Sequence, residues 1–95
     1  MTESYNNVNN TKNVESITIF IKTLNRTTVP LTVLLTDTID TVKKRCEEIV
    51  GSPKDLIRLL FNRKELKNEF TLGDYSISDK SDIQILLNIG RSYQM

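Results

Sequence analysis

The feature that most constrains the fold is a change in the spacing of apolar residues near residue 37. Before this point, two stretches place an apolar residue at every second position: Ile17, Ile19 and Ile21, then Val29, Leu31 and Val33. A period of two in β-branched and aliphatic residues predicts half-buried strands, so we interpret this region as a β-hairpin that turns at Asn25 and Arg26. Pro30 has no N–H to donate to a ladder, and we therefore expect the second strand at an edge of the sheet.

After residue 38 the apolar spacing becomes three or four, which predicts an amphipathic helix. The apolar stripe consists of Ile39, Val42, Cys46 and Ile49. Thr38 is a suitable N-cap, Gly51 suits the left-handed position after the last turn, and Pro53 prevents continuation. We expect one helix between Thr38 and Gly51.

Apolar residues also alternate in two later runs, residues 57–61 and 83–87, and this alternation predicts two further strands. Between these runs we expect a short strand at residues 64–66. The residues expected to point inward are Ile57, Leu59, Phe61, Ile83, Ile85 and Leu87. The order of elements predicts an α+β fold, in which a mixed sheet of four to five strands packs on one α-helix.

The length allows one domain, because 95 residues cannot bury two cores. Residues 1–15 are rich in asparagine and poor in apolar residues, so we expect a disordered polar tail there. The domain then covers residues 16–89, and residues 90–95 form a short C-terminal tail.

Charge and residue content exclude several functional classes. Thirteen Lys and Arg against twelve Asp and Glu leave a net charge of +1, so no charge excess would attract nucleic acid or a membrane surface. With no histidine and one cysteine, Cys46, the chain cannot form an internal disulfide, a Cys/His zinc site or a histidine-based catalytic dyad. We expect no enzymatic activity, no cofactor and no metal site, with Cys46 as a core residue.

The first residues lack the basic and apolar stretches of a signal peptide. We expect a monomer in the cytoplasm, the nucleus or both.

Groups of residues spread from position 19 to position 77 resemble a known family. They include helix caps and turn residues as well as core aliphatics: Ile19-Phe20, Lys22-Thr23-Leu24, Asp37-Thr38-Ile39, Val42-Lys43, Gly51, Pro53, Asp55, Arg58-Leu59, Phe61, Lys64, Leu66, Thr71-Leu72, Asp74-Tyr75 and Ile77. In this register the chain from Ile17 to about Ile89 resembles ubiquitin without a gap. The resemblance implies a β-grasp fold, whose second strand lies at a sheet edge.

The resemblance also implies a binding surface. Leu24, Leu60 and Leu86 match the shallow apolar patch through which receptors bind ubiquitin, and Gln84 stands where ubiquitin has a histidine. The strand alternation independently directs Leu60 and Leu86 outward, and outward leucines that gather on one face indicate an interaction site.

Charged residues are expected around this patch. Lys22, Arg58 and Lys64 would rim the leucines with positive charge, and Phe20 is a second candidate contact. An amphipathic helix with acidic residues could lie across such a surface. The expected partners are therefore proteins with ubiquitin-binding helices or domains, and proteasome subunits.

The C-terminal residues depart from those of ubiquitin-like modifiers. Arg91 and Ser92 occupy the positions of the diglycine through which such modifiers are conjugated, and Gly90 falls one place early. Asn88 replaces an arginine used for recognition by the activating enzyme. The leading hypothesis is a non-conjugated module that docks on ubiquitin receptors, the proteasome or related quality-control partners. The alternative is a diverged modifier attached covalently to target proteins.

Other departures from ubiquitin leave alternatives open. Arg26 and Arg63 replace turn glycines, so left-handed backbone must be carried by these arginines or transferred to Asn25 and Asn62. Lys64 matches a lysine through which ubiquitin chains are built, and it is either an acceptor or a solvated charge. Five apolar residues stand where ubiquitin has mostly polar residues or proline: Leu34, Leu35, Ile49, Val50 and Leu56. These residues either form an additional interface or pack locally.

Overall fold

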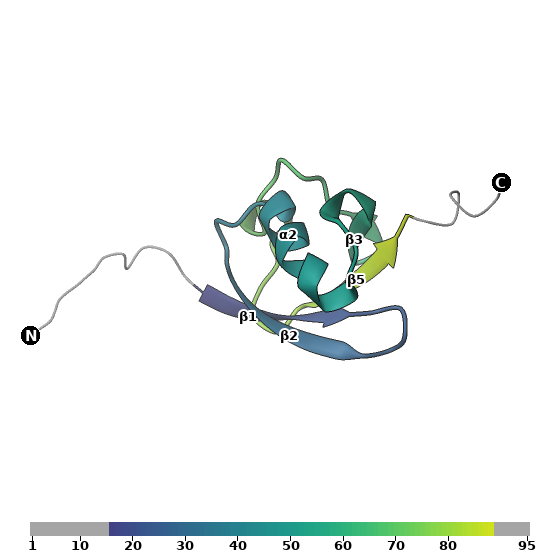
Figure 1. Cartoon of the computed structure of the whole chain (residues 1–95). Helices are drawn as coiled ribbons and strands as arrows, with labels where there is room; N and C mark the ends of the chain where they lie inside the picture. Colours follow the sequence, from purple (N-terminus) through teal and green to yellow (C-terminus); the bar gives the residue numbers. More distant parts are fainter. Residues whose placement is uncertain (1–15, 89–95) are drawn as a thin grey trace, which may run out of the picture.

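The computed structural model describes residues 16–88, which build a mixed five-stranded sheet covered by one α-helix (Figure 1). The strands are β1 (Ser16–Lys22), β2 (Thr28–Leu34), β3 (Ile57–Phe61), β4 (Lys64–Glu65) and β5 (Asp82–Leu87). Their order across the sheet is β2-β1-β5-β3-β4, with β1 parallel to β5 and all other pairs antiparallel. The α+β, β-grasp architecture expected from the sequence is confirmed. The tails expected over residues 1–15 and 90–95 lie outside the described residues.

The second strand lies at the sheet edge, as Pro30 predicted. In the β1–β2 ladder Phe20 pairs with Pro30, and Ile19 pairs with Leu31. Among the described residues, strand β2 has β1 as its neighbour on one side and no strand on the other. The missing N–H of Pro30 therefore interrupts no ladder.

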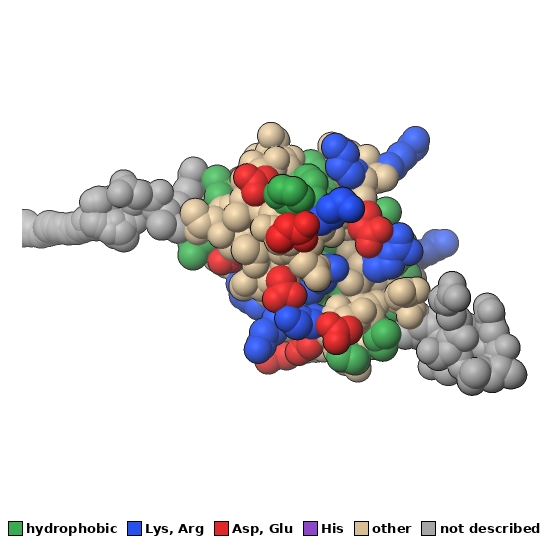
Figure 2. Space-filling model, turned by 90° about the horizontal axis from the view of Figure 1, so that it is seen from above, with side chains coloured by type: hydrophobic (Ala, Val, Ile, Leu, Met, Phe, Trp, Pro, Cys, Tyr) green, Lys and Arg blue, Asp and Glu red, His purple; other side chains and the backbone are tan. Residues whose placement is uncertain are grey.

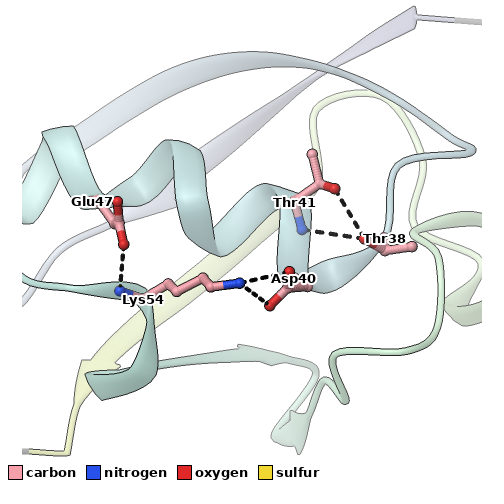
Figure 3. Close-up of polar contacts among 5 residues, drawn as sticks. All are labelled: Thr38, Asp40, Thr41, Glu47 and Lys54. Atoms are coloured by element: carbon pink, nitrogen blue, oxygen red, sulfur yellow. Dashed lines mark hydrogen bonds and ion pairs between the residues drawn. The ribbon is translucent and has the colours of Figure 1, made fainter.

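The α-helix of the described residues, α2 (Ile39–Val50), begins and ends where its capping residues predicted, and Figure 3 shows its N-terminal cap. The Thr38 hydroxyl accepts a hydrogen bond from the Thr41 N–H at 3.2 Å. Gly51 adopts the left-handed conformation with φ of 71°, and its N–H donates to the Glu47 carbonyl. Glycine has no Cβ to oppose this backbone conformation, so the helix can end there without strain.

Polar contacts hold the helix against the segment that follows it, the 3-10 helix η2 (Lys54–Leu56) (Figure 3). Lys54 Nζ lies 2.8 and 2.9 Å from the two carboxylate oxygens of Asp40, and the Lys54 N–H donates to the Glu47 carboxylate at 2.7 Å. The hydrogen bond to Asp40 raises the pKa of Lys54. Lys54 thus bridges the first and last turns of α2.

The core lies between α2 and the face of the sheet that the alternation predicted. Residues with no exposed surface come from the helix, from the three central strands and from the connection between β4 and β5: Ile19, Ile21, Ile39, Val42, Cys46, Leu59, Leu72, Ile83 and Ile85. Phe61 and Leu87, also expected inward, are partly buried and pack against this cluster. Burial raises the pKa of the Cys46 thiol to about 11, so Cys46 is a protonated core residue as expected.

The backbone shows which turn residues are left-handed, and the packing shows where the additional apolar residues lie. Arg26 carries a left-handed conformation itself, whereas Asn62 and Arg63 share it in the two-residue turn between β3 and β4. Two successive positive φ values are typical of a type I′ hairpin. Within the apolar set, Leu35, Ile49 and Val50 pack against the core, while Leu34 remains 38% exposed.

Candidate protein-binding surface on the sheet

The face of the sheet that points away from α2 aligns three predicted site residues in one row. Lys22 of β1 pairs with Gln84 of β5, and Gln84 pairs with Leu60 of β3. The Gln84 side-chain amide donates to the Lys22 carbonyl at 3.1 Å and to the Ile85 carbonyl at 2.9 Å. These bonds hold Gln84 across the β1–β5 boundary, between the basic and the apolar members of the row.

A second pair extends this row along the strands. Leu86 pairs with Arg58 across the β5–β3 ladder, two residues from the Gln84–Leu60 pair. Both Leu60 and Leu86 are partly buried. The two outward leucines are therefore diagonal neighbours on adjacent strands, close enough to contact one partner side chain. We call the set Lys22, Arg58, Leu60, Gln84 and Leu86 the outer-face surface.

The outer-face surface contains a shallow hollow of about 400 Å³. Its lining includes Lys22, Leu60 and Gln84, together with three residues that were not predicted as site residues: Asn62, Arg63 and Asp82. Asp82 precedes Gln84 by two residues on the same face of β5, so the alternation alone could have identified it. The β3–β4 turn brings Asn62 and Arg63 to the rim, and the conformation of that turn could not be inferred from spacing.

Ion pairs change the expected charge of the rim. Arg58 binds the Glu65 carboxylate through two hydrogen bonds, at 3.2 Å from Nε and 2.9 Å from Nη2. Lys22 Nζ lies 3.9 Å from an Asp82 carboxylate oxygen. The rim thus contains acidic as well as basic side chains, which the sequence analysis did not anticipate. The hydrogen bond from Arg58 lowers the pKa of Glu65, so this carboxylate remains ionised at neutral pH.

The remaining predicted site residues lie at or beyond the margins of this surface. Lys64 is exposed on β4, where it pairs with Phe61. Phe20 is partly buried on β1, and it pairs with Pro30 on one side and with Asp82 on the other. It therefore extends the outer-face surface along β1.

Leu24 is the one predicted patch leucine that does not lie on a strand of the sheet. It lies in the loop between β1 and β2, where its side chain is 57% exposed. It lines a different hollow at the end of the domain, with residues of α2 and β5. The structure therefore brings together two of the three leucines on the sheet and places the third at the margin.

The wider surface shows no concentration of one charge on the side seen in Figure 2. Acidic and basic side chains are interspersed there, with hydrophobic side chains among them. Within residues 16–88, no three His, Cys, Asp or Glu side chains gather as metal ligands would. In the same part of the chain, no helix is long and apolar enough to cross a membrane.

One further exposed apolar group was missed by the sequence analysis. Phe70 is 43% exposed and packs edge-on against Tyr75, with ring centroids 6.0 Å apart. The Tyr75 hydroxyl accepts a hydrogen bond from the Lys67 N–H at 2.8 Å. This aromatic pair stabilises the long connection between β4 and β5 and lies outside the outer-face surface.

Comparison with known proteins agrees with this geometry. The sequence model of the Ubiquitin family matches residues 19–89. The chain is also 32% identical, over 69 residues, to the NEDD8-like protein RUB3 of Arabidopsis thaliana. That alignment covers 73% of this chain and 88% of the relative.

Proposed function

The chain belongs to the ubiquitin family, and we propose that it acts in this family as a non-conjugated protein-interaction module. Its partners would be proteins with ubiquitin-binding helices or domains, including proteasome subunits and related quality-control factors, in the cytoplasm or the nucleus. The observation that carries the proposal is the outer-face surface, where Leu60 and Leu86 lie beside polar groups on paired strands of the sheet.

The chemistry of this surface suits a helical partner. Leu60 and Leu86 offer apolar area to the apolar face of an amphipathic helix, and the hollow beside Leu60 can receive one side chain. Lys22 and Asp82 provide charges of both signs, which would set the orientation of the helix more than its affinity. The small apolar centre predicts a weak, reversible interface of at most roughly 1,200 Å².

The C-terminal sequence supports a non-covalent function. Arg91 and Ser92 stand where modifiers of this family have glycine, and their side chains would crowd a narrow enzyme channel. Asn88 carries no charge at the position of the recognition arginine. Docking through the sheet needs neither feature.

The likeness to a NEDD8-like protein supports a second candidate function, that of a diverged modifier attached covalently to target proteins. This function would require activation of a C-terminus without the diglycine. The two candidates therefore differ in one observable, a covalent bond that survives denaturation.

A titration followed by NMR tests the proposed docking. A peptide with the sequence of a ubiquitin-binding amphipathic helix is added to the ¹⁵N-labelled chain, and we expect the largest shift changes at Lys22, Leu60, Gln84 and Leu86. Leu60→Ala should weaken binding by about tenfold or more, because it removes a central apolar contact.

Leu34→Ala is the matched control, since Leu34 is an exposed leucine at the far end of edge strand β2. It should leave the affinity unchanged. Equal affinity of the wild type and Leu60→Ala, or shift changes confined to other faces, would contradict the proposal.

A further inference from the structure

The connection between β4 and β5 contains a hollow of about 360 Å³ that is lined by Phe70, Asp74 and Tyr75. We call it the aromatic hollow. Phe70 is 43% exposed, and in the described part of the chain it is the one exposed aromatic side chain. A single exposed apolar residue is common on proteins, so its neighbours decide whether it belongs to a site.

The two rings of the aromatic hollow stand nearly perpendicular to each other. Their centroids lie 6.0 Å apart, and their planes meet at 79°. Such an edge-on contact uses the face of only one ring, so the face of the other ring is left for a ligand. Ring faces carry partial negative charge and attract cations, most often the guanidinium group of arginine.

Hydrogen bonds hold the polar groups of this hollow in place. Asp74 Oδ2 accepts the Thr71 N–H at 2.9 Å, and Thr71 Oγ1 accepts the Asp74 N–H at 3.1 Å. The Tyr75 hydroxyl accepts the Lys67 N–H at 2.8 Å. The carboxylate and the tyrosine ring are therefore positioned before any ligand binds, which reduces the entropy that binding costs.

The charge of the aromatic hollow is negative. Within residues 16–88, Asp74 forms no ion pair, and its second carboxylate oxygen, Oδ1, accepts no hydrogen bond. Lys67, the basic residue closest to Phe70 in the sequence, lines a separate hollow with Glu65 and Glu69. The aromatic hollow thus combines a ring face with a carboxylate that no described basic side chain neutralises.

We propose that the aromatic hollow binds an arginine side chain of a partner protein. A planar guanidinium group can stack on an aromatic face and donate to a carboxylate at the same time, whereas the ammonium group of lysine cannot stack. The volume lies within the roughly 300–1,000 Å³ typical of ligand sites, so one side chain has room there.

This site is separate from the docking proposed for the outer-face surface. The hollow of that surface and the aromatic hollow share no lining residue. Binding of arginine between Phe70 and Asp74 needs neither Leu60 nor Leu86. The two proposals can therefore fail independently.

A titration with single amino-acid derivatives tests the site without a partner protein. The ¹⁵N-labelled full chain is titrated with N-acetyl-arginine amide at constant ionic strength. We expect the amide signals of Phe70, Asp74 and Tyr75 to shift, and to shift about threefold less with the citrulline derivative, which has a similar shape but no charge. The lysine derivative should give about half of the arginine shifts, because its ammonium group cannot stack.

Two variants separate the contributions of the ring and the charge. Phe70→Leu keeps an apolar side chain and removes the ring face, while Asp74→Asn removes the charge and keeps an oxygen that can accept the Thr71 N–H. Each should reduce the arginine shifts by about threefold or more. Asp55→Asn is the matched control, because it removes one negative charge from an exposed residue of η2. It should leave the shifts unchanged.

Three results would overturn the proposal. Equal shifts with the arginine and citrulline derivatives would show that the hollow does not select a cation. Equal shifts with N-acetyl-leucine amide would assign the hollow to an apolar group. Equal weakening by Asp55→Asn and Asp74→Asn would show that arginine responds to the net charge of the chain and not to this site.

Discussion

The two faces of β5 place neighbouring residues of similar size in opposite surroundings. Ile83 and Ile85 point toward α2 and have no exposed surface, whereas Gln84 and Leu86 point away and are partly buried. The inner residues are held by packing on all sides, so they determine the fold. The outer residues have open space on one side, so they can change partner recognition without altering the fold. The contrast shows how a family fold can be retained while its binding surface changes.

The largest predicted effect compares adjacent residues on these two faces. Ile85→Ala should lower the free energy of unfolding by about 2–5 kcal/mol, because it leaves a cavity in a closely packed core. Leu86→Ala is the matched control and should cost less than about half as much, because solvent can fill the space that it leaves. Urea unfolding followed by circular dichroism measures both. Equal losses would mean that the outer face is also core.

A smaller effect is expected where the helix that covers the inner face begins. Thr38→Ala removes the hydroxyl that accepts the Thr41 N–H, and it should cost about 1 kcal/mol of unfolding free energy. Thr36→Ala changes an exposed threonine just before the helix and should cost much less. The same unfolding experiment compares them. Equal losses of unfolding free energy in the two variants would show that the Thr38 cap contributes no specific stability to the helix.

The smallest predicted effect is the pH-dependent stability that the Arg58–Glu65 ion pair on the outer face contributes. The Arg58 ion pair lowers the pKa of Glu65 below the ordinary value of 4.5. A carboxylate with a lowered pKa in the folded state contributes stability that is present above its ordinary pKa and is lost as the pH falls through the folded-state pKa. The melting temperature of the wild type should therefore approach that of Glu65→Gln as the pH falls from about 7 to about 2.

Salt provides the control for this effect, because it screens exposed ion pairs. Added salt at neutral pH should narrow the same difference in melting temperature. A difference that stays constant over the whole pH range would show that Glu65 acts through packing and not through its charge.

The inner face could be predicted well because its signals are local. Alternation identified Ile83 and Ile85 as inward, and the types of Thr38 and Gly51 located both ends of the helix. Each inference needed only residues a few positions apart. The Pro30 argument added the edge position of β2 from the chemistry of a single residue.

The outer face was predicted less completely because it depends on pairing between distant segments. Only the register of β1, β5 and β3 shows that Lys22, Gln84 and Leu60 share one row. The β3–β4 pairing likewise brings Glu65 to Arg58, which the sequence analysis did not foresee. Leu24 lines a different hollow, at the end of the domain, because of the loop that holds it, and a loop conformation with left-handed Arg26 could not be inferred from spacing.

A denaturing gel distinguishes docking, which we propose for this member of the family, from covalent attachment. The chain with an N-terminal tag is incubated with ATP in an extract that contains conjugating enzymes, then separated on a denaturing gel. We expect a single tagged band at the mass of the free protein. A ladder of heavier bands that requires ATP and disappears when residues 90–92 are replaced would contradict it.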